Sequence, residues 1–160
     1  DESMEIVVGK LLAERGATLA VAESCTGGLL GHRITNVPGA SRYLLADFVT
    51  YSNKAKQDIL GVPEEVLCEH GAVSEECVRA MAEGARRLVN ATYAVATTGI
   101  AGPTGGTPSK PVGTVYMAVT NGVNTKVQGF VWATSREVFK ERVAQMALNM
   151  LRQSILGELP

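Results

Sequence analysis

The chain has 160 residues, of which 46% are hydrophobic and 19% are charged, and its formal net charge is −1 with an isoelectric point near 6.2. This size and composition predict one globular domain over residues 1–160. Surfaces that bind nucleic acid are strongly basic, so the charge excludes that class and favours a small-molecule partner. The three cysteines are odd in number and have no C-x-x-C spacing, which argues against a disulfide framework or a structural zinc site and predicts a cytoplasmic protein.

The hydropathy pattern and the start of the chain bear on location. No apolar run approaches the roughly 18 to 20 residues that span a bilayer, so we expect no membrane partner. The polar start Asp1-Glu2-Ser3 is unlike a signal peptide. Because Asp1 stands where a methionine would begin a chain, we expect that an upstream segment can be missing.

Hydrophobic periodicity predicts helices that alternate with strands. Predicted helices cover 3–15, 26–35, 52–60, a short segment between Pro63 and Gly71, 74–89, and a last segment capped by Ser135 that ends near Gly157; predicted strands cover 18–22, 43–51, 93–98, 112–120 and 125–131. Asn121-Gly122 is a hairpin signal, so the last two strands should pair antiparallel. The pattern predicts an α/β protein, a three-layer α/β/α sandwich with a mixed, mainly parallel sheet of about five strands.

Two glycine-rich segments follow predicted strands. The first is 22–28 (AESCTGG) and the second is 99–106 (GIAGPTGG). In sheets of this kind ligands bind beyond the carboxyl ends of the strands, so we expect the loops after residues 22, 51 and 98 to meet. Ser24 is then a candidate nucleophile. The alternative is a helix that Ser or Thr caps, with no chemical role.

A serine nucleophile needs a base that takes its proton. His32 lies about two turns into the next predicted helix, and His70 lies at a helix end, so neither suits the role. A lysine with a lowered pKa is the available substitute. Lys54 and Lys56 both follow the strand that ends at Tyr51, and from the residues alone both can equally be solvated helix lysines.

Five segments in order carry a family resemblance. They are 22–28 (AESCTGG), 48–56 (FVTYSNKAK), 71–74 (GAVS), 98–106 (TGIAGPTGG) and 110–115 (KPVGTV). Together they resemble the CinA C-terminal domain family, whose characterised members are nicotinamide-nucleotide amidohydrolases, also called NMN deamidases or PncC. The resemblance covers essentially the whole chain.

This resemblance implies hydrolysis of nicotinamide mononucleotide (NMN) to nicotinate mononucleotide and ammonia in NAD salvage, without a metal or other cofactor. It implies Ser24 as nucleophile, Lys56 as general base and Tyr51 as an assisting hydroxyl. The expected substrate-binding groups are N–H groups around the oxyanion, the second glycine loop, and an arginine for the phosphate: Thr26, Gly27, Gly28, Thr98, Gly99, Ala101, Gly102 and Arg136.

The far end of this expected site departs from the family pattern. The family commonly has Gly-Asp-Arg where this chain has Thr134-Ser135-Arg136, and it frequently has arginine where this chain has Lys140. The phosphate and ribose contacts therefore stay open. An alternative function is a non-catalytic nucleotide-binding module detached from a two-domain competence/damage-inducible CinA protein. We also expect a homo-oligomer, because symmetric oligomers are common.

Overall fold

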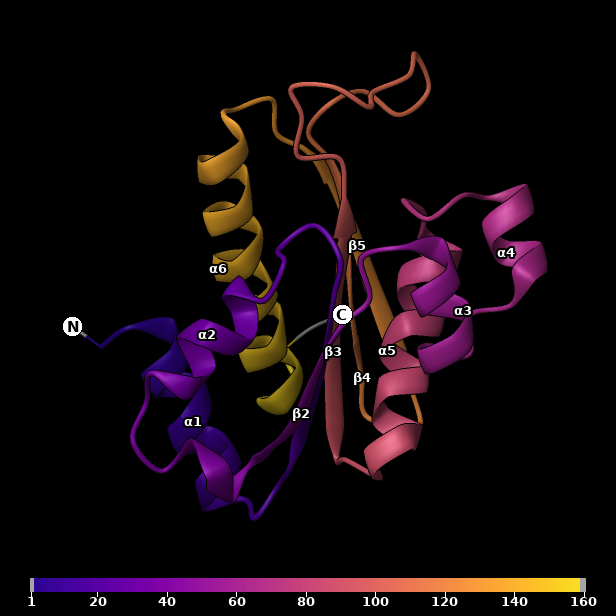
Figure 1. Cartoon of the computed structure of the whole chain (residues 1–160). Coiled ribbons are helices and arrows are strands. Elements are labelled where there is room, and N and C mark those ends of the chain that lie inside the picture. The colour runs from indigo at the N-terminus through magenta and orange to yellow at the C-terminus, as the bar shows by residue number, and fades with distance from the viewer. Residues whose placement is uncertain (1, 159–160) are drawn as a thin grey trace.

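Five strands form one mixed sheet at the centre of the structure (Figure 1), a computed structural model that describes residues 2–158. In sheet order they are β2 (Leu44–Val49), β1 (Leu19–Glu23), β3 (Tyr93–Gly99), β4 (Thr114–Thr120) and β5 (Thr125–Val131). β1 pairs in parallel with β2 and β3, whereas β4 is antiparallel to both β3 and β5. Four strands therefore run in the same direction, and the predicted mixed, mainly parallel sheet with a final antiparallel hairpin is confirmed.

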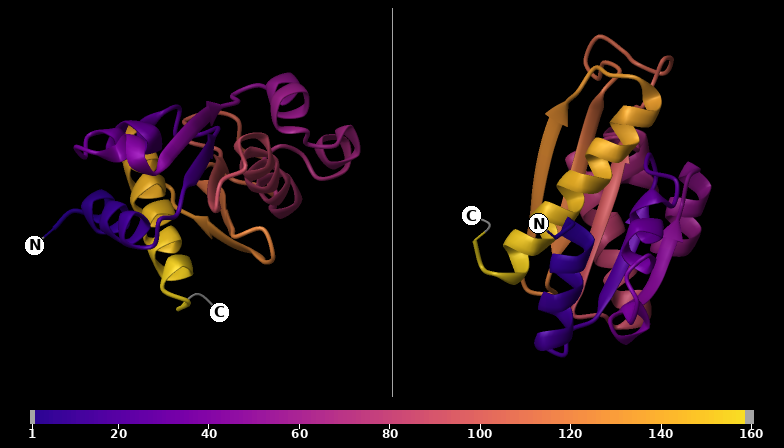
Figure 2. Two further views of the ribbon diagram at one scale, coloured as in Figure 1. Left: turned by 90° about the horizontal axis from the view of Figure 1, so that it is seen from below. Right: turned by 90° about the vertical axis from the view of Figure 1, so that its left-hand side faces the viewer.

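Helices cover both faces of this sheet (Figure 2). One face carries α5 (Glu75–Val89), with α3 (Asn53–Leu60) and α4 (Glu64–Glu69) beside it. The other face carries α1 (Met4–Glu14), α2 (Leu29–Thr35) and α6 (Arg136–Ile155), and a short 3-10 turn at Ala40–Arg42 precedes β2. The three-layer prediction is confirmed. None of the helices within residues 2–158 has the length and apolar character of a membrane span.

The two faces of the central strands bury residues of different size. On the α5 face the strands present small side chains, and on the α6 face they present larger ones such as Leu19, Val21 and Val95. The small residues on the α5 face are Ala20, Ala22, Ala94, Ala96 and Ala118. Because alanine adds little bulk, α5 can pack close to β1 and β3, and strands covered on both faces are apolar throughout.

Serines occupy the N-cap positions of α3, α5 and α6, and two of the three make a capping hydrogen bond. Ser52 Oγ accepts a hydrogen bond from the Ala55 N–H at 3.0 Å and starts α3, and Ser74 Oγ accepts from the Cys77 N–H at 3.1 Å and starts α5. Ser135 occupies the N-cap position of α6, but its side chain makes no capping hydrogen bond.

α2 begins later than the sequence predicts, at Leu29 instead of residue 26. Gly27 and Gly28 have φ angles of +59° and +103°, a left-handed conformation that a right-handed helix cannot include. The N-cap residue is therefore Gly28, which has no side chain to cap with, and the alternative of a helix capped by Ser or Thr is wrong. Residues 24–28 form an irregular turn at the end of β1, which we call the nucleophile loop.

Candidate active site

The carboxyl ends of β1, β2 and β3 meet at one cavity of about 210 Å³. Residues from the loops after all three strands line it, together with the segment before α5 and the start of α6. The lining residues are Ser24, Cys25, Tyr51, Asn53, Lys56, Ala72, Val73, Thr98, Gly99, Ala101 and Arg136. The predicted convergence of the three loops is confirmed, and neither histidine is among the lining residues.

Ser24 and Lys56 are in contact inside this cavity. The Lys56 Nζ lies 2.8 Å from the Ser24 Oγ, 2.7 Å from the Thr50 carbonyl oxygen and 3.1 Å from the Tyr51 carbonyl oxygen. β2 ends at Val49, two residues earlier than predicted, so these two carbonyls lie beyond the strand and can accept bonds from Lys56. The side chain of Lys54 is instead exposed and paired with Asp58. The structure therefore places Lys56, and not Lys54, beside the serine.

The surroundings of Lys56 favour its neutral form. The residue is 1% exposed, and no carboxylate within residues 2–158 pairs with it. Burial lowers the pKa of Lys56, because the charged amine loses its hydration. A neutral amine has two N–H donors and one lone pair. With the two carbonyls accepting the hydrogens, the lone pair can face the Ser24 hydroxyl and take its proton.

Cys25 is adjacent to the serine but is not available as a nucleophile. Its side chain is 5% exposed, and burial raises the pKa of its thiol to about 12. A thiol attacks as its thiolate, so Cys25 stays in its unreactive form at neutral pH. Its sulfur packs against Gly99, where an added Cβ would lie 3.2 Å from the Sγ atom.

The nucleophile loop offers N–H groups near the serine. The Gly27 N–H already donates to the Ser24 carbonyl at 3.1 Å, and the Gly28 N–H donates to the Glu23 carboxylate at 3.2 Å. The backbone N–H groups of Cys25 and Thr26 have no hydrogen-bond partner within the described part of the chain. Of the donors that the sequence suggests, Gly27 and Gly28 are engaged, and Thr26 is 0% exposed and does not line the cavity. Cys25 does line the cavity and is an additional candidate.

The second glycine loop forms the opposite wall. Thr98 is 1% exposed, and its hydroxyl donates to the Ala72 carbonyl at 2.9 Å, which ties the end of β3 to the segment before α5. Gly99 approaches the backbone so closely that an added Cβ would lie 2.9 Å from the Thr114 carbonyl oxygen. Ala101 lines the cavity, and the Gly102 carbonyl points to Arg136.

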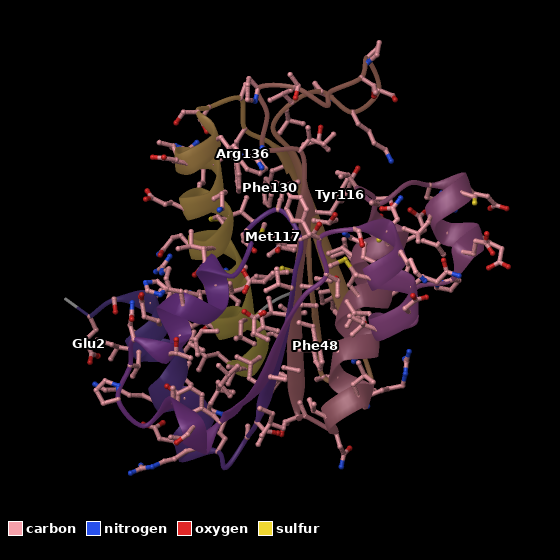
Figure 3. All side chains as sticks on the ribbon, in the orientation of Figure 1. Glu2, Phe48, Tyr116, Met117, Phe130 and Arg136 are labelled. Atoms are coloured by element: carbon pink, nitrogen blue, oxygen red, sulfur yellow. The ribbon has the colours of Figure 1, made fainter. Side chains whose placement is uncertain are left out.

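Arg136 and Tyr51 form the exposed rim of the cavity. The arginine donates from Nη1 to the Gly102 carbonyl at 2.8 Å and from Nη2 to the Tyr51 hydroxyl at 2.9 Å, and Tyr51 is 61% exposed. Figure 3 shows Arg136 at the start of α6, toward the end of the molecule that carries the loop between β3 and β4. The Tyr51 hydroxyl thus contacts Arg136, whereas it is the Tyr51 carbonyl that contacts Lys56.

The structure adds site residues that the sequence did not single out. Asn53, Ala72 and Val73 line the cavity, and all three lie in segments of the family resemblance, Asn53 in 48–56 and the other two in 71–74. Lys140 lies one helical turn after Arg136, and its Nζ would be 3.5 Å from a Cβ placed on Gly27. Of these two cationic side chains of α6, Lys140 therefore lies beside the nucleophile loop and Arg136 lines the cavity.

The fold and the site define an α/β/α sandwich protein with a serine–lysine pair at the carboxyl edge of its sheet. Residues 1–155 match the CinA C-terminal domain, and the chain belongs to this family. It is 54% identical over 155 residues to a CinA-like protein of Syntrophus aciditrophicus and 49% identical over 157 residues to one of Thermotoga maritima. The chain is covered to 96% and 98% in these comparisons but spans only 37% and 38% of the two relatives.

Solved structures of similar length share the fold. The competence damage-inducible protein A of Klebsiella pneumoniae is 32% identical, with a TM-score of 0.92 over 97% of this chain and 98% of its own. A competence/damage inducible protein of Agrobacterium tumefaciens is 36% identical, with a TM-score of 0.87 over 98% of this chain and 97% of its own. The family identified from the five sequence segments is confirmed.

Proposed function

We propose that the chain is an amidohydrolase that converts NMN and water to nicotinate mononucleotide and ammonia. The observation that carries the proposal is the 2.8 Å contact between Ser24 Oγ and the Nζ of Lys56, a buried lysine that no carboxylate within residues 2–158 pairs with. A hydrolase that acts through an acyl-enzyme needs a lysine of lowered pKa in contact with its serine, because the neutral amine takes the hydroxyl proton. A site that only binds a ligand does not need such a lysine.

The reaction follows in two stages. Neutral Lys56 takes the hydroxyl proton as Ser24 Oγ attacks the carboxamide carbon, and the N–H group of Cys25, which lines the cavity, stabilises the oxyanion. The Lys56 ammonium then gives its proton to the leaving nitrogen, and ammonia departs. Lys56 next activates a water that attacks the ester carbonyl, and nicotinate mononucleotide leaves as the Ser24 hydroxyl is restored.

A neutral base also suits the charge of the substrate. The nicotinamide ring of NMN carries a formal positive charge, which a lysine ammonium beside it would repel, and which withdraws electrons from the carboxamide. The cavity of about 210 Å³ is smaller than the roughly 300 to 1,000 Å³ of most small-molecule sites. We therefore place the ring and its carboxamide inside the cavity, with the ribose phosphate extending over the rim.

At the rim, Arg136 and Lys140 supply positive charge for the phosphate. Arg136 is the first residue of α6, where unpaired N–H groups and the helix dipole also favour an anion. Two of its donors are used by Gly102 and Tyr51, which leaves three of the five guanidinium donors for a ligand. Thr134 and Ser135 replace the family's usual residues beside this arginine without removing either cation.

The test is ammonia release from NMN, nicotinamide riboside and nicotinamide by purified wild-type protein and Ser24→Ala. We expect turnover of NMN above that of the two compounds that lack phosphate, and none with the variant. Saturable NMN binding without ammonia release by the wild type would favour the non-catalytic binding module instead. A cytoplasmic homo-oligomer without a nucleic-acid partner remains the expectation from the sequence.

A further inference from the structure

The carboxylate of Glu23 lies beneath the nucleophile loop. It takes no part in the proposed reaction. Glu23 immediately precedes Ser24 and is 0% exposed. Its Oε1 accepts hydrogen bonds from the Thr26 hydroxyl at 2.5 Å, the Gly28 N–H at 3.2 Å and the Leu30 N–H at 2.9 Å. Its Oε2 accepts from the Gly31 N–H at 3.0 Å. One side chain therefore serves as the cap that Gly28 cannot provide to α2.

A second carboxyl group, that of Asp47, lies against Glu23. Asp47 stands opposite Val21 in the parallel ladder of β1 and β2, and Glu23 stands opposite Val49, so both acids project from the same face of the sheet. Asp47 Oδ1 is buried and has no partner among the acceptors and donors of residues 2–158. At Gly31 an added Cβ would lie 2.1 Å from Asp47 Oδ2, so α2 closes tightly over the pair.

Two carboxyl groups in contact, one of a buried residue and one of a half-buried residue, are stable only when they hold a proton between them. Burial and the charge of Glu23 raise the pKa of Asp47 to about 9, and the hydrogen bonds from Asp47, Thr26 and the α2 backbone lower the pKa of Glu23 despite its burial. At neutral pH Asp47 is then a neutral donor, and Glu23 is the anion that accepts both from it and from the backbone.

We propose that Glu23 is a positioning residue for Ser24 and that Asp47 holds Glu23 in place. The inference rests on the proposed function for its effect on catalysis, but the loop geometry can be tested without it. Four of the accepted bonds come from residues 26–31, and a second tie joins the Thr26 and Thr97 hydroxyls at 2.9 Å. Because Cys25 lies between Glu23 and the anchored Thr26, Glu23 also sets the direction of the free Cys25 N–H group.

The other charged groups near this pair are few. The charge of Glu23 adds to the raised pKa of the Cys25 thiol, which stays protonated. On α2, His32 is exposed and Arg33 is engaged by Glu5 and Gln145. Lys140 of α6 lies beside Gly27, where its Nζ would be 3.5 Å from an added Cβ. Thr97 on β3 does not titrate. Burial is therefore the largest cause of the raised pKa of Asp47, and Glu23 is the charged group that adds to it.

The experiment compares wild-type protein with Glu23→Gln, Asp47→Asn and Asp47→Ala. Gln has the shape of Glu, but its NH2 group would face backbone N–H donors. We expect the amide hydrogens of Gly28, Leu30 and Gly31 to exchange at least tenfold faster in Glu23→Gln. For NMN hydrolysis we expect kcat to fall about 100-fold with KM changed less than threefold, as for a misplaced nucleophile. Asn at position 47 keeps a donor toward Glu23, so Asp47→Asn should keep both the exchange rates and kcat.

The pH dependence supplies a readout that simple destabilisation does not. In the folded protein Asp47 holds its proton up to about pH 9, whereas in the unfolded chain it loses it near 3.8, so its contribution to stability falls as pH rises between these values. We expect the Asp47→Asn variant to lack this fall, so that its stability relative to wild type grows with pH.

The outcomes separate the two proposals. Unchanged amide exchange and kcat in Glu23→Gln would overturn the positioning role. If that variant does not fold, the two Asp47 variants decide. Asp47→Asn must keep the wild-type exchange rates and kcat, whereas Asp47→Ala must exchange at least fivefold faster and have a kcat at least fivefold lower. Equal behaviour of the two variants would overturn the inference. A wild type without amidase activity would refute the proposed function. The exchange measurements would still test whether Glu23 holds the nucleophile loop in place.

Discussion

Ser24 and Lys56 form the floor of the cavity, and Tyr51 and Arg136 form its rim. The two regions differ in their burial and in their charge. The two floor residues are 9% and 1% exposed and make a single pair without a charge partner. The rim residues are exposed, and the arginine keeps its charge. The difference fits the proposed function, in which the floor carries out chemistry that needs a neutral amine and the rim attracts an anion that water also reaches.

Helix α3 shows the same contrast over two residues. Lys54 faces solvent, and its hydrogen bond to Asp58 raises its pKa, whereas burial lowers the pKa of Lys56. The two lysines have identical side chains in one helix, so only the environment separates them. They are therefore a matched pair for testing whether the floor performs the chemistry.

The largest effect is expected from Lys56→Met. Removal of the base should lower kcat for NMN by at least about 10³-fold, as for other nucleophile–base pairs. Lys54→Met, its control, should stay within about twofold of wild type. Met also fills the buried space without a polar group, so the thermal midpoint of Lys56→Met at pH 7 should be no lower than that of wild type. More than a tenth of wild-type kcat in Lys56→Met would contradict the role of the base.

The next effect is a pH dependence that Lys56 sets. The kcat/KM for NMN should rise with pH as Lys56 loses its proton, at a pH below the ordinary lysine value of 10.5. The contribution of Lys56 to stability should rise over the same range, because between the folded pKa and 10.5 the unfolded chain binds a proton that the folded protein does not. Asp47 contributes a fall that both variants share, so denaturant unfolding from pH 6 to 10 should give a more positive slope of stability against pH in Lys54→Met than in Lys56→Met. An equal slope in both variants would refute it.

A smaller effect, on binding instead of turnover, is expected at the rim. Arg136→Gln should raise the KM for NMN about 10- to 100-fold, the loss of charge-assisted hydrogen bonds worth about 1.5 to 3 kcal/mol, with kcat changed only a few-fold. Arg142→Gln is the control on the same helix, since Arg142 lies 5.8 Å from the centre of the Trp132 ring and lines no part of the cavity. A fall in kcat without a change in KM would show that the arginine belongs with the floor.

The smallest effect concerns the cysteines. Cys68 is exposed, whereas Cys25 and Cys77 are buried with thiol pKa values raised to about 12 and about 11. Iodoacetamide at pH 7.5 should therefore modify Cys68, as read by mass spectrometry, and change the rate of ammonia release less than twofold. Loss of activity in parallel with modification of Cys25 would contradict this prediction and would indicate that the thiol takes part in the site.

The comparison also shows how far the sequence reaches. The order of elements, the hairpin after Thr120 and the meeting of three loops follow from periodicity and turn residues, which act locally. The start of α2 differs from the prediction, and Ser135 stands at the predicted N-cap position but makes no capping hydrogen bond, because left-handed glycines and unused side-chain oxygens depend on the surrounding chain. Glu23 sits inside the recognised segment, yet nothing local shows that its carboxylate turns inward to cap α2.

The sequence by itself determined that this is an α/β protein of the CinA C-terminal domain family, with a serine in a glycine-rich turn and two lysines within reach of it. The tertiary structure decided which lysine meets Ser24, because burial is a property of the packed chain and not of the residue. It also brought Asp47 of β2 to Glu23 of β1 and Arg136 of α6 to Tyr51, contacts between residues 24 and 85 positions apart. Such contacts arise only when the strands and helices are packed, so local pattern could not reveal them.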